Sequence, residues 1–190
     1  MRARRCANPI AVAQTPDQQA FALLSVYAAV LETAADLARD PAVPAAVKRA
    51  LSEAEATATP VVLALTTVFD AYAQAPDEAA AQALADATAR AQSPLVVLQA
   101  AVLPLLPTPL QKRIGPVLSA AGWVSALGGT PDADVASLTV RLAQVRAEVE
   151  ALARAGRRPA MTEIHRAVAR VGVASAALHE VLGIAEADGA

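Results

Sequence analysis

The chain has 190 residues, a mass of 19.3 kDa and a formal charge of −2, and 55% of its residues are hydrophobic, which argues against intrinsic disorder and fits one domain or two small ones. Alanine accounts for 51 residues, while only two Phe, two Tyr and one Trp are present, so a β-sandwich core and an aromatic surface for stacking bases both lack the side chains they need. The single cysteine, Cys6, excludes an intramolecular disulfide and a cysteine-based zinc cluster within the chain.

The first 14 residues are predicted to form a basic arm ahead of the folded domain. Residues 1–6 carry the positive charges of a signal peptide, but no apolar stretch of the required length follows, so export is not expected. Cys6 is followed by Ala-Asn-Pro, which is typical of the residues after the cleavage point of a bacterial lipoprotein. Two interpretations of Cys6 stay open, a free thiol on the arm and a lipid attachment site.

Six helices are predicted in chain order, and no segment alternates as a strand does. They lie at about 16–39, 44–75, 77–106, 109–127, 131–155 and 160–186. The run Thr15-Pro16-Asp17-Gln18 gives the first helix an N-cap, a proline in its first turn and a capping box. The sequence therefore predicts an all-α fold, an antiparallel bundle of about six helices without a sheet over residues 15–190, with a subdivision near 107–109 or 128–131.

Three helices carry an apolar stripe with a repeat of three or four residues, which indicates a face turned toward a partner helix. The stripes consist of Val47, Leu51, Ala54, Ala58, Val61, Leu65, Val68 and Tyr72; of Val135, Leu138, Leu142, Val145, Val149 and Leu152; and of Ile164, Val168, Val171, Leu178 and Leu182 with Ser175. The first stripe crosses Pro60 in phase, so we expect a kink there and not a break. An antiparallel hairpin of the first two helices places Tyr27 near Thr57.

The second helix is longer than the first, so its last turns, with Phe69 and Tyr72, extend past the start of the first helix. Ile10 and Val12 are the only large apolar residues of the arm, and we predict that they cover these two aromatic side chains. Ile10 and Val12 are therefore candidate interaction residues. The alternative is that the aromatic residues meet the third helix or a neighbouring subunit while the arm stays free.

The most apolar stretch, residues 95–107, is shorter than the roughly 20 residues that span a bilayer, so a buried central helix is the favoured interpretation. The alternative is a hairpin that touches a membrane, with Lys112 and Arg113 at the headgroups and Trp123 in the segment that follows. These three residues are candidate contact residues.

No group of residues has the pattern of a catalytic, metal or cofactor site. His165 and His179 share one helix face but lie fourteen residues apart, about 21 Å at 1.5 Å per residue, so they cannot share a metal ion. Glu180, beside His179, is interpreted as a surface charge, and so are Glu53 and Glu55, which lie two residues apart on the second predicted helix. No phosphate loop or dinucleotide motif occurs. We predict that the protein is not an enzyme and has neither a cofactor nor a nucleic-acid partner.

Charge is unevenly spread along the chain. Residues 15–90 hold ten acids against four bases, and residues 141–170 hold seven arginines against three glutamates. Opposite patches on one chain are typical of domain packing or of head-to-tail self-association. A protein partner or a homo-oligomer is therefore expected, without a small-molecule substrate.

The first part of the chain contains four short runs of interest within about residues 6–75: residues 15–23, Tyr27-Ala28-Ala29, Ala34-Ala35-Asp36-Leu37 and Asp40-Pro41-Ala42-Val43-Pro44. In these runs the chain resembles the opening of small alanine-rich helical proteins encoded by tailed bacteriophages and prophages. The resemblance implies a structural or interaction protein of a phage particle or a prophage, located in the virion or the bacterial cytoplasm. The alternative is a membrane-associated, lipoprotein-like protein of the cell envelope, anchored through Cys6.

Overall fold

A computed structural model describes residues 9–106 and 133–183 of the chain, and these residues form helices and turns without a strand. The helices are α1 (Pro9–Val12), α2 (Pro16–Ala38), α3 (Ala45–Gln74), α4 (Glu78–Val102), the 3-10 helix η1 (Leu103–Leu105), α7 (Ala133–Arg154) and α8 (Met161–Leu182). The predicted all-α fold is confirmed. The helix predicted at 109–127 and both predicted subdivision points lie outside the described residues.

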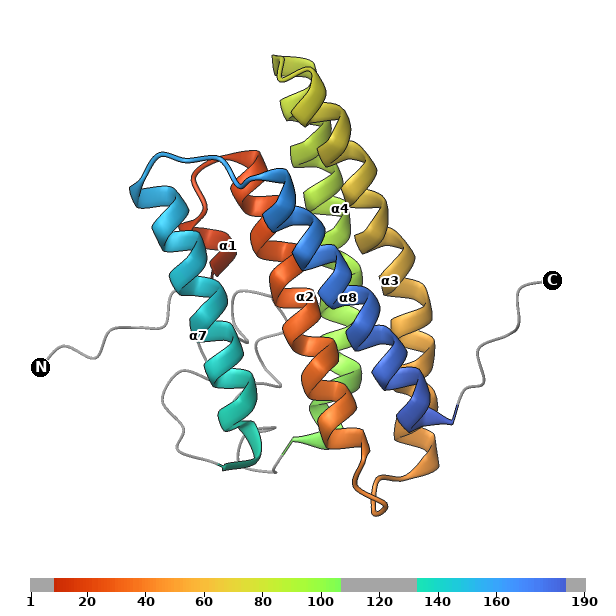
Figure 1. Cartoon of the computed structure of the whole chain (residues 1–190). Helices are drawn as coiled ribbons and strands as arrows, with labels where there is room; N and C mark the ends of the chain where they lie inside the picture. Colours follow the sequence, from red (N-terminus) through yellow and green to blue (C-terminus); the bar gives the residue numbers. More distant parts are fainter. Residues whose placement is uncertain (1–8, 107–132, 184–190) are drawn as a thin grey trace, which may run out of the picture.

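Helix α2 lies at the centre, with α4, α7 and α8 packed around it, while α3 packs mainly on α4 and α8 (Figure 1). The chain reverses direction between α2 and α3, between α3 and α4 and between α7 and α8 (Figure 1). Helices α2 and α8, however, run in the same direction, because Asp17 at the start of α2 pairs with Arg158 ahead of α8, and Glu32 pairs with Arg170 farther along. The pairs α2–α3, α3–α4 and α7–α8 therefore run antiparallel, whereas α2 and α8 run parallel.

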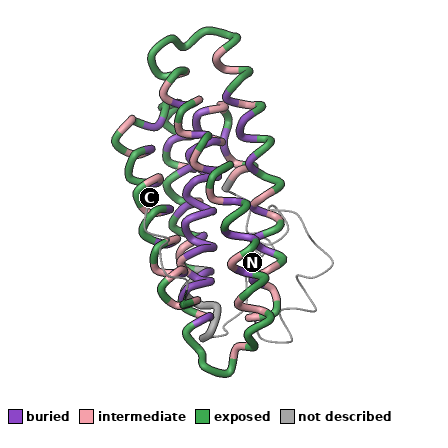
Figure 2. Tube along the Cα trace, turned by 90° about the vertical axis from the view of Figure 1, so that its right-hand side faces the viewer, coloured by how far each residue is buried: buried purple, intermediate pink, exposed green. Residues whose placement is uncertain are grey.

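The composition of α2 explains its central place. It has no charged residue from Gln18 to Leu31, and every residue from Ala20 to Leu31 is buried. Figure 2 shows a buried central helix with exposed positions on the outer sides of the helices around it. A helix that is apolar on all sides is stable in water only when other helices cover it all round.

The apolar stripes predicted for the last two helices are confirmed among the described side chains. The buried residues are Leu138, Leu142, Val145, Val149 and Leu152 in α7, and Ile164, Val171 and Leu178 in α8. Helix α7 ends in a Schellman motif, in which Gly156, at a φ of 57°, donates to the carbonyl of Ala153 and Arg157 donates to that of Leu152. This turn fixes the position of Arg157 between α7 and α8.

Helix α3 runs unbroken through Pro60, but its buried stripe departs from the predicted one after Ala58. Val61 is 39% exposed, and Val68 and Tyr72 are only half-buried. The buried residues are Leu51, Ala54, Glu55, Ala58, Val62, Leu65 and Phe69. The prediction alternated steps of three and four residues, whereas an α-helix with 3.6 residues per turn drifts away from that 3.5-residue repeat.

The prediction that the arm covers the end of α3 is wrong. Residues 9–12 form α1, which packs on α7 and α2, and half-buried Ile10 lies against the core. Val12 is half-buried in the same short helix. Tyr72 is covered by Arg158, whose guanidinium carbon lies 4.5 Å from the ring centre, and Phe69 is buried in the stripe of α3. The cover comes from the α7–α8 connection, which is distant in sequence but adjacent to the end of α3.

The start of α2 also differs from the predicted capping box. Thr15 is the N-cap residue, but its hydroxyl donates to the side chain of Asp17 and makes no capping hydrogen bond. The side chain of Gln18 accepts from the backbone N–H of Gln14 at 2.9 Å and donates to the carbonyl of Arg157 at 2.9 Å. Gln18 therefore joins the start of α2 to the turn after α7.

The acidic and basic regions of the chain form ion pairs with each other between neighbouring helices of the bundle. Arg141 of α7 and Arg170 of α8 bind Glu32 of α2 at 3.1 and 3.0 Å, and Arg141 also binds Asp36 at 2.8 Å. Of the two explanations for the uneven charge, packing within the domain is thus observed. Self-association stays a prediction.

Candidate functional site

A cluster of polar side chains lies between α2, α3 and α8. Oε1 of Glu55 accepts hydrogen bonds from the hydroxyls of Ser175 and Thr59, both at 2.6 Å, and Oε2 lies 2.7 Å from Nε2 of His179. The hydroxyl of Tyr27 lies 2.8 Å from that of Thr59. Because Thr59 donates its only hydrogen to Glu55, Tyr27 is the donor in this bond. We call these five residues the polar cluster.

Burial and hydrogen bonding act in opposite directions on Glu55, whose side chain is 2% exposed. Burial raises the pKa of the carboxyl, but the hydrogen bonds from Ser175, Thr59 and His179 together outweigh it, so the pKa of Glu55 lies below its ordinary value. Burial raises the pKa of Tyr27 well above its ordinary value, against the hydrogen bond to Thr59. At neutral pH the polar cluster therefore contains a charged carboxylate and a neutral tyrosine.

The polar cluster contains a serine, a histidine and a carboxylate, the residue types of a catalytic triad, but their order differs. In a triad the histidine lies between the nucleophile and the carboxylate. Here Glu55 lies between Ser175 and His179 and accepts the hydrogen bond of the Ser175 hydroxyl, so His179 is not placed to act as a base for Ser175. What the arrangement does is tie α8 to α3 through charge-assisted hydrogen bonds.

A second histidine–carboxylate pair lies farther along α3 and α8. Nε2 of His165 is 3.8 Å from Oδ1 of Asp70, and this oxygen and the hydroxyl of Thr66 are buried without a hydrogen-bond partner in the described ranges. His165 and His179 share one face of α8, as predicted, and each meets its own carboxylate of α3. Within residues 9–106 and 133–183, no group of three or more His, Cys, Asp or Glu is placed to hold a metal ion.

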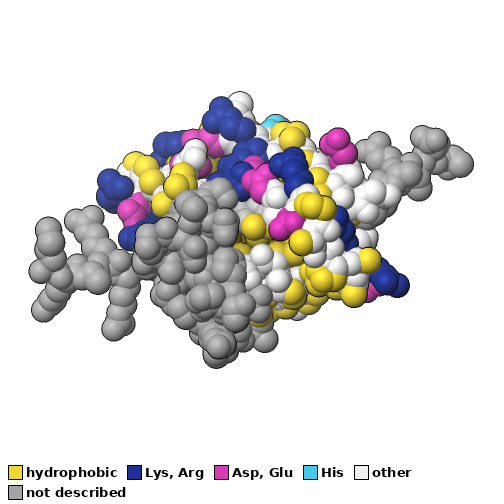
Figure 3. Space-filling view, turned by 90° about the horizontal axis from the view of Figure 1, so that it is seen from below, with side chains coloured by type: hydrophobic (Ala, Val, Ile, Leu, Met, Phe, Trp, Pro, Cys, Tyr) yellow, Lys and Arg dark blue, Asp and Glu magenta, His cyan; other side chains and the backbone are white. Residues whose placement is uncertain are grey.

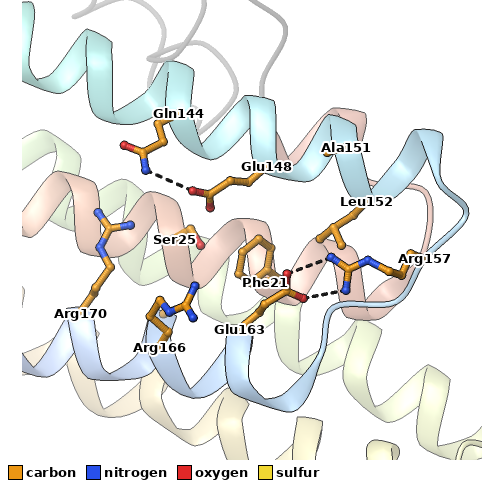
Figure 4. Close-up of a pocket in the computed structure, with 11 residues that line it drawn as sticks. Phe21, Ser25, Gln144, Glu148, Ala151, Leu152, Arg157, Glu163, Arg166 and Arg170 are labelled. Carbon is orange, nitrogen blue, oxygen red and sulfur yellow. Dashed lines mark hydrogen bonds and ion pairs between the residues drawn. The ribbon is translucent and has the colours of Figure 1, made fainter.

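A groove runs between α7 and α8 over α2 (Figure 4). Both helices pack on α2 but not along each other, which leaves a space of about 440 Å³. Its floor is formed by Phe21 and Ser25, its walls by Gln144, Glu148, Ala151 and Leu152 of α7 and by Glu163, Arg166, Ala167 and Arg170 of α8, and its end by Arg157. We call this space the α7–α8 groove. Its volume lies within the range of about 300–1,000 Å³ that is usual for small-molecule sites.

The charged side chains of the α7–α8 groove differ in how they are paired. Arg157 and Glu163 form two hydrogen bonds of 2.9 and 3.0 Å, which raise the pKa of Arg157 and lower that of Glu163. Arg170 binds both oxygens of Glu32, at 3.0 and 3.2 Å. Arg166 forms no hydrogen bond or ion pair with any residue that the structure describes, and its charge acts on Glu163 only from a distance.

The outer side of α3 faces solvent and is uncharged from position 56 onward. Its exposed residues between positions 56 and 72 are Ala56, Thr57, Pro60, Val61, Ala64, Thr67 and Ala71, and we call these seven the outer stripe. The one charged residue in this range, Asp70, faces α8. Figure 3 shows most charged side chains along the upper side of the described surface, whereas the lower right of the view is hydrophobic and uncharged except for a basic and an acidic side chain at its right-hand edge.

Two of the described helices, α2 and α3, are long and apolar enough to cross a membrane by length and composition alone. In α2, 83% of the most apolar stretch is buried, so its central place accounts for this composition, whereas in α3 only 22% is buried. In the stretch predicted as a buried central helix, Leu95, Leu98, Val102 and Leu106 are buried, but Val97 is 50% exposed. This stretch therefore packs with one face on α2, which is the central helix, and the prediction of a buried central helix at residues 95–106 is wrong.

The structure brings together only two of the interaction residues predicted from the sequence. Ile10 and Val12 lie in α1, against α7 and α2. The other four lie outside the described residues, so a lipid anchor and a membrane-facing hairpin stay predictions; these are Cys6, Lys112, Arg113 and Trp123.

Sequence reasoning missed the polar cluster and the groove. Glu55 was interpreted as a surface charge, although its place between Ala54 and Ala58 on the stripe of α3, like that of Ser175 on the stripe of α8, is a signal of burial. No comparable signal exists for the α7–α8 groove, because it depends on two helices that pack on a third and not on each other.

Comparisons of the chain with protein-family models, with curated proteins and with solved structures give no match.

Proposed function

We propose that this is a non-enzymatic structural or interaction protein that assembles with itself or with another protein through the outer stripe of α3. The observation that carries the proposal is the long uncharged face of a helix that has only 22% of its most apolar stretch buried. Extended apolar surfaces on a folded domain are typical of interaction sites.

The spacing and size of the side chains favour a helical partner. The outer stripe follows the three- and four-residue steps of one helix face. Most of its side chains are alanine and threonine, which allow a second helix to approach closely, and packed helix axes lie about 8–10 Å apart. The polar cluster holds the other side of α3 on α8, so the outer stripe is presented on a firmly fixed helix.

Sedimentation velocity of the full chain at tens of micromolar and low salt tests the proposal. We expect an oligomer, or a partner in affinity pull-downs, and we expect both to be lost in the double variant Ala64→Glu with Thr67→Glu, because two charges then face the partner helix. Ala143→Glu, on the exposed side of α7, is the matched control and should behave as the wild type. A monomer without any partner, or assembly unaffected by the double variant, would contradict the proposal.

A second candidate function is membrane association in the cell envelope, and the length and apolar composition of α3 favour it. Flotation of the full chain with phosphatidylcholine vesicles, lost in the same double variant, would support this function in place of protein assembly. Intact mass and detergent partitioning of the chain made in bacteria would show whether Cys6 carries lipid.

The biological setting that we propose is a phage particle or a prophage, and it is supported by the resemblance of residues 6–75 alone. We expect the protein in a proteomic census of purified particles. Its absence from particles of a strain that produces it would argue for the bacterial cytoplasm or envelope.

A further inference from the structure

We propose that the α7–α8 groove binds a small zwitterion, an α-amino acid or a dipeptide, whose carboxylate contacts Arg166 and whose ammonium group contacts Glu148. This binding site is separate from the proposed assembly function, because none of its residues belongs to the outer stripe of α3.

The floor of the groove carries an unpaired hydroxyl. Ser25 is 2% exposed and lines the groove, and its hydroxyl forms no hydrogen bond with any residue in the described parts of the chain. The buried threonines Thr33 and Thr88 differ, since each donates to a carbonyl one turn back at 2.8 Å. In the described ranges, Oγ of Ser25 is not among the fully buried side-chain atoms that lack a partner, so the hydroxyl opens into the groove. A polar group in the groove can therefore form a hydrogen bond with it.

Each wall of the groove carries one charged side chain that forms no ion pair within the described ranges, and the two charges have opposite sign. On α8, Arg166 has no hydrogen bond or ion pair among the described residues. On α7, Glu148 accepts one hydrogen bond, from the amide of Gln144 at 3.2 Å, and forms no ion pair within the described ranges. Figure 4 shows the two side chains on opposite walls, on either side of Ser25. The other charged side chains of the groove are already paired, Arg157 with Glu163 and Arg170 with Glu32.

A zwitterion matches these unpaired groups. A guanidinium binds a carboxylate through two parallel hydrogen bonds, and the hydroxyl of Ser25 supplies a further donor from the floor. An ammonium group pairs with the carboxylate of Glu148. Phe21 and Leu152 give the apolar contact that an aliphatic side chain needs. A simple anion would gain Arg166 but face Glu148 unpaired, so both charges of the ligand are required.

Titration calorimetry of the full chain with L-leucine tests the site. We expect a dissociation constant of about 1 mM or below. N-acetyl-L-leucine lacks the positive charge and leucine methyl ester the negative charge, and each should bind at least about tenfold more weakly. Glycyl-L-leucine separates the two charges, so its affinity relative to leucine decides between an amino acid and a dipeptide.

Variants locate the site. Arg166→Gln and Glu148→Gln should each weaken leucine binding at least about tenfold, and Ser25→Ala should weaken it less, since one neutral hydrogen bond is lost. Arg154→Gln is the matched control, because Arg154 is an exposed cation of α7 that does not line the groove. The proposal is overturned if neither leucine nor glycyl-leucine binds at about 10 mM, if the blocked derivatives bind equally well, or if Arg166→Gln melts and binds as the wild type does.

Discussion

Helices α2 and α3 have similarly apolar sequences, yet α2 is the centre of the bundle and α3 forms part of its surface. Helix α2 is covered by α4, α7 and α8, whereas α3 has close neighbours on its inner side only. The difference lies in the polar residues. Helix α2 has no charge from Gln18 to Leu31, while α3 turns its carboxylates Glu55 and Asp70 toward α8 and leaves only uncharged residues exposed between positions 56 and 72. Apolar composition thus indicates a helix, and the direction of its charged residues indicates its neighbours.

The largest expected effect separates the two helices directly. Leu24→Ala in α2 removes a fully buried side chain and should lower the free energy of unfolding by about 2–5 kcal/mol. Val61→Ala on the outer stripe should cost less than about 0.5 kcal/mol, because Val61 is 39% exposed. Chemical denaturation of both variants measures this difference. Equal losses would mean that α3 is covered in solution and that the contrast between the helices is wrong.

The next effect concerns the carboxylate that α3 turns inward. Glu55→Ala leaves Ser175, Thr59 and His179 without their shared acceptor and should destabilise the protein by about 3 kcal/mol. Glu53→Ala, two residues away on the exposed surface, is the control and should change stability little. Similar melting temperatures for the two variants would show that the polar cluster does not hold α3 to the bundle.

A smaller effect is expected at the end of α3. Arg158→Ala removes the ion pair with Asp17 at 2.8 Å and the contact with the ring of Tyr72, and should cost about 1–2 kcal/mol. Asp17 keeps its bonds to Thr15 and to the backbone of Gln18, which limits the loss. Arg154→Ala, an exposed arginine of α7, is the comparison in thermal unfolding. If Arg158→Ala is as stable as that control, the α7–α8 connection does not secure α3.

The smallest effect is a pH dependence of the polar cluster. The pKa of Glu55 is lower in the folded chain than in the unfolded chain, so its charged form adds stability above the unfolded pKa of about 4.3. This contribution is lost as the pH falls through the folded pKa. Between about pH 6 and pH 3 the melting temperature of the wild type should therefore fall more than that of Glu55→Gln, whose side chain carries no charge at either pH. Parallel losses in both proteins would indicate that Glu55 is not stabilised as a carboxylate.

Periodicity predicts the amphipathic helices well and the uniform ones poorly. The stripe of α7 from Leu138 to Leu152 is found as predicted, because one face is apolar and the other is charged. Helix α2 offers no such contrast, so its sequence does not indicate which helices surround it. The hairpin arithmetic brings Tyr27 to Thr57, and the observed contact is with Thr59, an error of half a turn that follows from the unknown geometry of the connecting loop.

Contacts between distant residues account for the remaining errors. The cover of Tyr72 comes from Arg158, and the partners of Glu55 come from Ser175 and His179. The stripes of α3 and α8 signal that Glu55 and Ser175 face inward, but no local sequence signal says which residues meet. The α7–α8 groove depends on the same long-range packing, so neither its floor nor its two walls could be assembled from periodicity.

The central place of α2 has a consequence for the synthesis of the protein. The helix is complete when the ribosome has passed Ala38, but α8, which covers it, is complete only at Leu182. At about 5–20 residues per second, synthesis of the chain from the end of α2 to the end of α8 takes roughly 7–29 s. During this time α3 and α4 are the first described partners to emerge after it, and only α4 packs extensively on α2. Part of the apolar surface of α2 therefore stays without its native cover until α7 and α8 have been synthesised.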